Sequence, residues 1–269
     1  MAPDPSLMKT WPAEAIWQAV APSLPGFSVE ILPSIDSTNS ELMRRAHNGQ
    51  VDPVLLVALQ QTAGRGRLGR QWQSAADPRL ALTFSLGLPL RMSDWSGLSL
   101  AVGLSLVDSL HPRLSLKWPN DLYLDGRKLG GILIETLRVA EQRYAVIGVG
   151  INIGPLEPSG LSTPPAWLRE LDPTADPGQT LLRLTPALVQ AVLAFTEQGF
   201  APLRNAFLQR DALANAQVQL SDGSCGRAAG VDPSGALLVQ AREGLRRIDS
   251  AEVSVRPRLP TEKGEPCSG

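Results

Sequence analysis

The residues with the clearest chemical meaning lie between positions 61 and 70, where three glycines and three arginines fall within ten residues. Glycine lets the backbone approach an anion closely, and the planar arginine side chain binds phosphate or carboxylate. The spacing Gly64-x-Gly66-x-x-Gly69 is not a dinucleotide fingerprint, because arginines stand where a helix should begin, and the P-loop pattern is absent. The segment predicts a mobile loop that binds a nucleotide phosphate, although a solvated basic loop or a nucleic-acid contact also fits its composition.

A second group of charged residues surrounds one tight turn. Lys117-Trp118-Pro119-Asn120-Asp121 is followed by Lys128 at the start of a strand, and Asp125-Gly126 between them is a strong hairpin signal. Two lysines, an amide and a carboxylate are thereby brought to one hairpin. They form either part of an active site or an ion-paired structural turn.

Taken together with three further motifs, these segments resemble one family, the biotin protein ligases. The motifs, in the family's order and spacing, are Ser37-Thr38-Asn39, residues 61–72, residues 117–121, residues 127–132 and Gly148-Val149-Gly150-Ile151-Asn152. The resemblance spans about residues 35–256. It implies that the biotin carboxylate attacks the α-phosphate of ATP, with Mg²⁺, to give biotinoyl-AMP and pyrophosphate, and that a carrier lysine then takes the biotin.

The resemblance also implies which residues bind biotin. The neutral ureido head would be held by Ser37, Thr38, Asn39 and Gln61, which are neutral donors and acceptors. Thr38 also has the position of a helix cap, within the capping-box pattern of residues 38–41. Gly131 would let the backbone approach biotin closely.

The charged chemistry would fall to the loop and the hairpin. By the resemblance, Arg65, Gly66 and Arg67 would line the biotin carboxylate and the phosphates, Arg70 would meet the leaving phosphates, and the loop would order on ligand binding. Lys128 would bridge carboxylate and α-phosphate. Asp121 would receive the carrier lysine, or else serve Mg²⁺ or orient Lys128. The predicted catalytic residues are therefore Lys128, Arg67 and Asp121.

The nucleotide would also be contacted by Asn120, Asn152 and Trp167, with Trp167 stacked on adenine. We expect Trp72 and Trp118 to be packing residues. His47 and His111 have no partners at metal-ligand spacing, so no protein-held metal site is predicted.

Charge and hydropathy limit the remaining possibilities. The formal net charge is -1, so no overall positive field would draw the chain to DNA or to an anionic membrane. The start lacks a secretory signal pattern and no 18-residue apolar run occurs, which predicts a cytoplasmic protein. Because only 36 residues precede Ser37, we expect the class without an N-terminal DNA-binding domain.

The periodicities predict an α+β protein with a mixed sheet. Helices are expected near residues 11–20, 38–48, 95–110 and 185–213, and strands near 28–32, 54–59, 80–86, 122–124, 129–137 and 144–153. Residues 1–214 would form the catalytic domain, which by the resemblance is class II synthetase-like. Short strands from 218 onward predict a small β-barrel over 215–259, which by the resemblance is SH3-like, and 260–269 reads as a disordered tail.

Alternatives remain at this point. A lipoate or octanoyl ligase has the same fold, and a non-catalytic binding protein, such as a biotin-responsive regulator, would keep part of the site. The resemblance implies the biotin carboxyl carrier protein of acetyl-CoA carboxylase as partner. By family analogy, the strand at 144–153 is a candidate sheet edge for pairing with a carrier or with a second subunit in a homodimer.

Overall fold

A seven-stranded mixed sheet forms the centre of the computed structural model, which describes residues 11–73, 75, 77–92, 94–139, 142–156, 164–249 and 255–257. The strand order is β1-β2-β3-β7-β6-β5-β4, in which β1 and β2 are parallel and the other pairs antiparallel. The strands are β1 (Ser28–Leu32), β2 (Val54–Ala58), β3 (Ala81–Leu90), β4 (Ser115–Lys117), β5 (Asp121–Leu124), β6 (Arg127–Val139) and β7 (Gln142–Asn152). The prediction of an α+β protein with a mixed sheet is confirmed.

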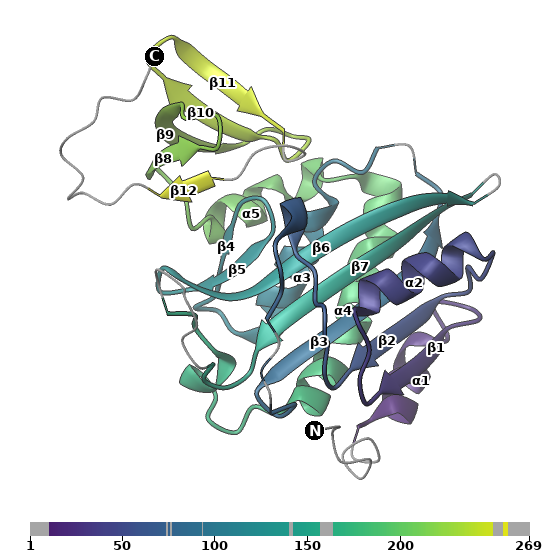
Figure 1. The fold of residues 1–269 in the computed structure, drawn as a ribbon. Coiled ribbons are helices and arrows are strands. Elements are labelled where there is room, and N and C mark those ends of the chain that lie inside the picture. The colour runs from purple at the N-terminus through teal and green to yellow at the C-terminus, as the bar shows by residue number, and fades with distance from the viewer. Residues whose placement is uncertain are drawn as a thin grey trace.

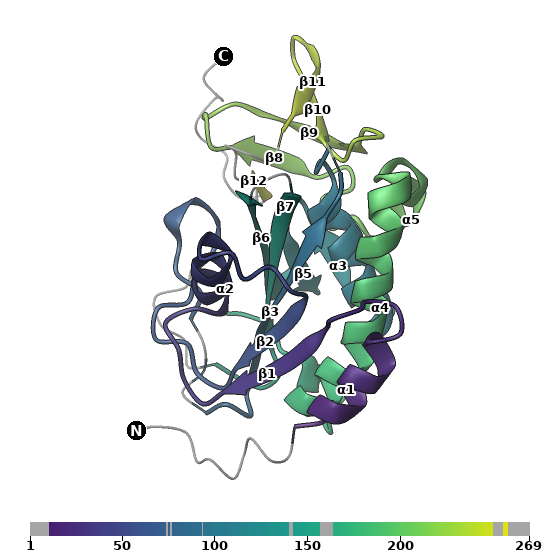
Figure 2. The same ribbon diagram turned by 90° about the vertical axis from the view of Figure 1, so that its right-hand side faces the viewer.

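Helices cover the two faces of this sheet unequally (Figure 2). On one face lie α1 (Ala13–Val20), α3 (Leu98–Leu110), α4 (Pro177–Gln198) and the short α5 (Arg204–Arg210). The other face carries α2 (Thr38–His47), which joins the parallel strands β1 and β2 as a β-α-β crossover. Among the described helices, none is both long and apolar enough to cross a membrane.

The start of α2 differs from the prediction in one residue. The cap is Ser37, whose hydroxyl accepts a hydrogen bond from the Ser40 amide, so the assignment of the cap to Thr38 was wrong. Thr38 is the first helical residue and is buried. Its hydroxyl is therefore free of the capping role.

The helix predicted for residues 185–213 is longer at its start and broken near its end. Asp176 caps α4 by accepting a hydrogen bond from the Gln179 amide at 3.1 Å, and Pro177 occupies the first turn, where a missing amide proton costs nothing. Gly199, at φ 63°, ends α4 before α5 begins.

Strand β7 lies inside the sheet rather than at its edge. It pairs with β3 over residues 143–152 and with β6 over residues 142–151. The interpretation of this strand as a free edge for a carrier or a second subunit was therefore wrong, because the backbone groups on both of its sides are already paired. The edges of the sheet are β1 and β4.

A separate antiparallel sheet follows α5 and lies above one end of the large sheet (Figure 1). Its order is β11-β10-β9-β8-β12, from strands β8 (Gln217–Leu220), β9 (Cys225–Val231), β10 (Leu237–Ala241), β11 (Gly244–Ile248) and β12 (Val255–Pro257). The small β-domain is confirmed, but within the described residues β11 and β12 do not pair, so the sheet is open and not a closed barrel. The domain limits at 214 and 259 stay a prediction, and the predicted tail lies outside the described residues.

Candidate active site

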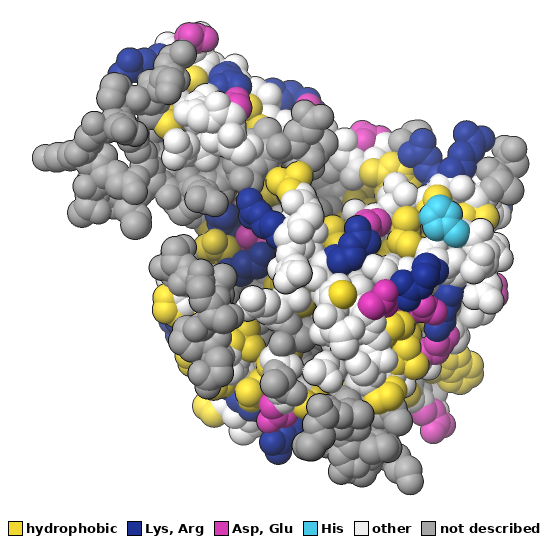
Figure 3. All heavy atoms as spheres, viewed as in Figure 1, with side chains coloured by type: hydrophobic (Ala, Val, Ile, Leu, Met, Phe, Trp, Pro, Cys, Tyr) yellow, Lys and Arg dark blue, Asp and Glu magenta, His cyan; other side chains and the backbone are white. Residues whose placement is uncertain are grey.

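A cavity of about 330 Å³ opens on the face of the large sheet that carries α2. It is lined by the start of α2, the segment 61–72, the hairpin between β4 and β5, and strands β6 and β7. Figure 3 shows lysine and arginine side chains, with an acidic side chain among them, in the hollow beneath the C-terminal sheet. The predicted site residues that line it are Ser37, Thr38, Asn39, Gln61, Arg65, Gly66, Arg67, Arg70, Asn120, Asp121, Lys128 and Gly131.

One end of the cavity, around the start of α2, is formed mainly by neutral polar groups. Gln61 Oε1 accepts a hydrogen bond from the Thr38 amide at 2.8 Å and lies 3.2 Å from the Thr38 hydroxyl. The Ser85 hydroxyl on β3 lies 2.7 Å from Thr38 Oγ1 and donates to Asn39 Oδ1 at 2.6 Å. These groups, of which Gln61 is half-buried and the others are buried, hold one another in fixed positions, which suits recognition of a neutral polar ligand.

The other end carries positive charge around one carboxylate. Lys128 Nζ lies 2.6 Å from Asp121 Oδ1, and Lys117 Nζ lies 3.9 Å from Asp121 Oδ2. The Asp121 side chain is 16% exposed, whereas that of Lys128 is 43% exposed and can reach a ligand. Burial, followed by the charge of Asp121, raises the pKa of Tyr123 to about 12, so the phenol stays neutral beneath Lys117.

Arg67 supplies a further, half-buried cation. Its guanidinium donates to Asn120 Oδ1 at 3.4 Å, and Asn120 in turn donates to the Ile132 carbonyl at 2.7 Å. Burial, and to a smaller extent the charge of Arg70, lowers the pKa of Arg67, while Asp121 opposes this change. A cation that has already lost much of its water gains more from an incoming anion than an exposed one does.

The glycine-arginine segment folds back on itself instead of forming an open loop. The Gly66 amide donates to the Arg70 carbonyl at 2.7 Å, and the Trp72 amide donates to the Gly64 carbonyl at 2.9 Å. A short 3₁₀ turn, Arg67–Gly69, forms the tip, where Leu68 has φ 55°. Ordering of this loop on ligand binding stays a prediction.

Trp72 packs against the backbone of Gly150 and forms part of the cavity wall. A methyl group added at Gly150 would overlap its indole ring, and Lys128 Nζ lies 5.9 Å from the ring centroid. Its Nε1 atom is buried and has no hydrogen-bond partner among the described residues.

Trp118, in contrast, packs in the core as predicted. It is 1% exposed, and its Nε1 donates to the Gly235 carbonyl at 3.0 Å. Because Gly235 lies in the turn between β9 and β10, the C-terminal sheet holds the residue next to Lys117. The hairpin with Asp121 is therefore held by the C-terminal sheet through Trp118 and by strand β6 through β5.

A second cavity, of about 410 Å³, adjoins the first. Both are lined by Arg67, Pro119, Asn120 and Ile132. Trp95 and Ser99, near the start of α3, line the second cavity, and within the described part of the chain Trp95 Nε1 and Ser99 Oγ are buried without hydrogen-bond partners. Neither residue was predicted to belong to a site.

The described residues contain no cluster of three or more His, Cys, Asp or Glu side chains that could hold a metal ion. Of the described side chains that line the first cavity, Asp121 alone is a carboxylate, and both its oxygens face lysines. This donor set does not fit a protein-held Mg²⁺, which prefers several free oxygen ligands.

Comparison with known proteins identifies the family. The model of the biotin/lipoate A/B protein ligase family matches residues 31–152, and that of the biotin protein ligase C terminal domain matches residues 217–256. The biotin–acetyl-CoA-carboxylase ligase of Paracoccus denitrificans is 34% identical over 244 residues, which cover 83% of this chain and 98% of that protein. The chain belongs to the biotin protein ligase family.

Other members of the biotin protein ligase family agree in sequence and fold. The bifunctional ligase/repressor BirA of Escherichia coli is 33% identical, with 87% of this chain and 75% of that protein covered. The structure of the biotin protein ligase from Aquifex aeolicus in complex with biotin and ATP superposes with a TM-score of 0.72 at 28% identity, covering 87% of this chain and all of that one (100%).

Two residues to which the family resemblance assigns a nucleotide contact do not line the cavity. Asn152 is 3% exposed, and its amide donates to the Ala166 carbonyl at 3.0 Å. The Ala166 amide donates to the Lys128 carbonyl at 2.8 Å, so Asn152 fixes the segment before Trp167 beside β6. Nucleotide contacts of Asn152 and Trp167 stay predictions.

Ser85 and Glu135 are polar residues near the site that the family motifs do not single out. Ser85 stands in an apolar strand, where a fully buried hydroxyl needs a partner. Glu135 interrupts the apolar residues of β6, and its carboxylate pairs with Arg65. In both cases a polar residue between apolar neighbours in a strand was the signal that could have identified them.

Proposed function

We propose that this member of the family is an ATP-dependent biotin protein ligase, which forms biotinoyl-AMP and transfers biotin to a lysine of a carrier protein. The observation that carries the proposal is a single cavity whose end at Asn39 is formed mainly by neutral polar groups and whose end at Asp121 carries lysines. The first end suits the ureido head of biotin. The second suits a carboxylate next to nucleotide phosphates.

In the first step, a carboxylate oxygen of biotin attacks the α-phosphorus of ATP, and the bond from that phosphorus to the pyrophosphate oxygen breaks. Two anions must approach each other, so the step needs cations that lie between them. Lys128 and Arg67 meet this need, because both line the cavity and their side chains are held by Asp121 and Asn120.

In the second step, the amine of the carrier lysine attacks the acyl carbon of biotinoyl-AMP, an amide bond forms, and AMP leaves. The lysine must lose a proton before it attacks. Asp121 is the carboxylate next to this point, and we propose that it first orients Lys128 and then receives the incoming lysine. We propose that this side chain enters through the second cavity, which shares Asn120 with the first.

Magnesium would enter with ATP as part of the substrate, bound to its phosphates, because the residues that line the cavity do not fit a protein-held ion. The name of the Paracoccus relative supports the carrier subunit of acetyl-CoA carboxylase as partner. We further propose a cytoplasmic location. A homodimer, if formed, would use a surface other than β7.

The direct test supplies ATP, Mg²⁺ and either biotin or lipoate, and measures pyrophosphate release and labelling of a purified biotin carboxyl carrier domain. We expect pyrophosphate release and carrier labelling with biotin but not with lipoate. Turnover of lipoate instead would make the chain a lipoate ligase. Binding of biotin without pyrophosphate release would make it a non-catalytic binding protein, and either result would overturn the proposal.

A further inference from the structure

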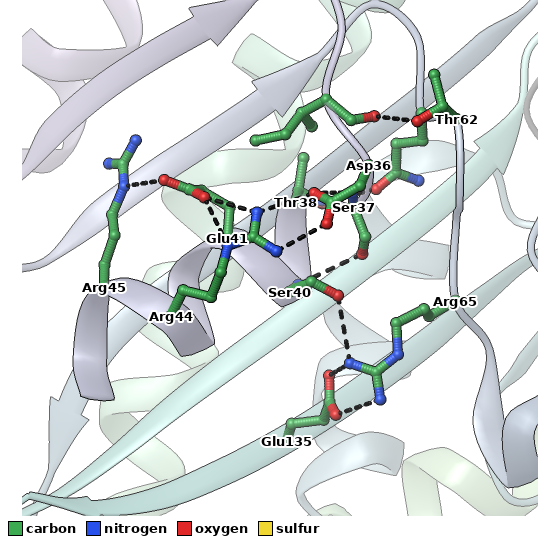
Figure 4. A network of polar contacts seen from close by, with 12 residues as sticks. Asp36, Ser37, Thr38, Ser40, Glu41, Arg44, Arg45, Thr62, Arg65 and Glu135 are labelled. Atoms are coloured by element: carbon green, nitrogen blue, oxygen red, sulfur yellow. Dashed lines mark hydrogen bonds and ion pairs between the residues drawn. The ribbon is translucent and has the colours of Figure 1, made fainter. Parts of the chain in front are cut away.

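Glu135 on β6 connects the neutral end of the cavity to the glycine-arginine segment. Its carboxylate is paired with the guanidinium of Arg65 through two contacts, NH2 to Oε1 at 2.9 Å and NH1 to Oε2 at 3.2 Å. Oε2 also accepts a hydrogen bond from Asn39 Nδ2 at 3.0 Å. Figure 4 shows the Arg65 side chain reaching from the segment toward Glu135 and Ser40.

The contacts of Asn39 leave a single orientation for its amide. Both protons of Nδ2 are taken, one by the Leu133 carbonyl at 3.2 Å and one by Glu135, while Oδ1 accepts from the Ser85 hydroxyl. The reverse orientation would set the amide oxygen against a carbonyl and a carboxylate. Asn39 is 3% exposed, so water cannot relieve such a conflict.

One acceptor site on Asn39 remains for a ligand. A carbonyl oxygen has two lone pairs, and Ser85 uses one of them. The negative charge of Glu135 on the far side of the amide polarises it and makes the remaining lone pair a stronger acceptor. An acceptor fixed in this way recognises an N–H donor, as a urea offers, and disfavours a ligand head that has none.

We propose that Glu135 is a positioning residue that sets the specificity of the cavity for a ureido N–H by orienting and polarising Asn39. Arg65 holds the carboxylate of Glu135 in place through an ion pair, which is why a half-buried acid is tolerated inside the strand. This inference rests on the proposed function, since it assumes that biotin occupies the cavity.

Steady-state pyrophosphate release tests the inference, with biotin varied at saturating MgATP and ATP varied at saturating biotin. Glu135→Gln keeps the size of the side chain and removes its charge. We expect its KM for biotin to rise about tenfold, while kcat and the KM for ATP change less than about twofold. Arg65→Met, which loosens Glu135, should raise the KM for biotin about threefold. Glu135→Asp, which keeps the charge, should fall between wild type and Glu135→Gln.

Glu41→Gln is the matched control, because Glu41 pairs with Arg44 and Arg45 on the outer side of α2 and does not line the cavity. Its kinetic constants should equal those of wild type. A KM for biotin within twofold of wild type in Glu135→Gln, or a parallel rise of both KM values in Glu135→Gln or Glu135→Asp, would overturn the inference. Absence of pyrophosphate release in wild type would overturn the proposed function instead.

Discussion

Asp211 carries a buried charge where the chain leaves α5 for the C-terminal sheet. The residue forms an isolated β-bridge with Leu116, and the next amide, of Ala212, donates to the Leu116 carbonyl at 2.9 Å. Asp211 Oδ1 accepts from the Leu213 amide at 2.8 Å, but Oδ2 is buried and finds no donor within the described part of the chain. Burial raises the pKa of Asp211 from 3.8 to about 6, although the hydrogen bond from Leu213 opposes this rise.

The pKa of Asp211 fixes both the sign and the size of a dependence of stability on pH. A carboxyl whose folded pKa lies above its unfolded value favours the folded state while it is protonated, and that contribution is lost as the pH rises through about 6. Full ionisation in the folded state costs about 3 kcal/mol. Between about pH 5 and about pH 7.5, the free energy of unfolding should therefore fall by about 1.4 kcal/mol from this group.

Asp211→Asn removes the titration, and urea unfolding followed by tryptophan fluorescence measures its effect. Between about pH 5 and about pH 7.5, the free energy of unfolding of the variant should rise by about 1.4 kcal/mol relative to that of wild type. Asp232→Asn is the control. The pKa of Asp232 is held at about 2, because hydrogen bonds from Ser234 and Arg247 outweigh its burial, so its stability difference should be constant over this range. Parallel curves for Asp211→Asn and wild type would refute the reasoning.

Further predictions concern the reaction itself. Lys128→Ala should lower the rate of pyrophosphate release at saturating substrates by about 10² to 10³, because the cation between carboxylate and phosphate is lost; a change below tenfold would contradict its role. Arg67→Gly should still form the adenylate but release it about tenfold faster, measured by trapping free biotinoyl-AMP; equal retention would contradict this. Ser85→Ala should raise the KM for biotin about fivefold, because the hydrogen bond to the side-chain oxygen of Asn39 is lost. Gly150→Ala should abolish biotin binding by calorimetry, since its methyl group overlaps Trp72, and normal binding would exclude that contact.

Short-range patterns in the sequence predicted the elements well wherever a local signal defined them. Asp125-Gly126 marks the hairpin between β5 and β6, and both residues have positive φ, 49° and 76°. Apolar runs found β2 and β7 but could not show that β7 lies between β3 and β6, because strand order depends on contacts between distant residues. The motifs likewise identified most of the residues that line the cavity. Asn152 is an exception, because its side chain donates a hydrogen bond to the Ala166 carbonyl instead of facing the cavity.

The glycines of the motifs have a more specific role in the structure than conformational freedom. Gly131 on β6 pairs with Gly150 on β7. Gly148, two residues before Gly150 on β7, lies on the same face of the sheet. A methyl group at Gly148 would overlap Asn39 Oδ1, one at Gly150 would overlap Trp72, and one at Gly131 would lie 3.3 Å from Lys128 Nζ. Each glycine thus makes room for one side chain of the cavity.

This arrangement accounts for the division of the cavity into two ends. Asn39 comes from α2, Trp72 from the end of the glycine-arginine segment, and Lys128 from the start of β6. All three lie directly on the backbone of β6 and β7, which hydrogen bonds hold on both sides. Because a paired strand deforms less than a loop, the sheet sets the distance between the Asn39 amide and the Lys128 ammonium group. We expect the glycine-arginine segment to close over a bound ligand.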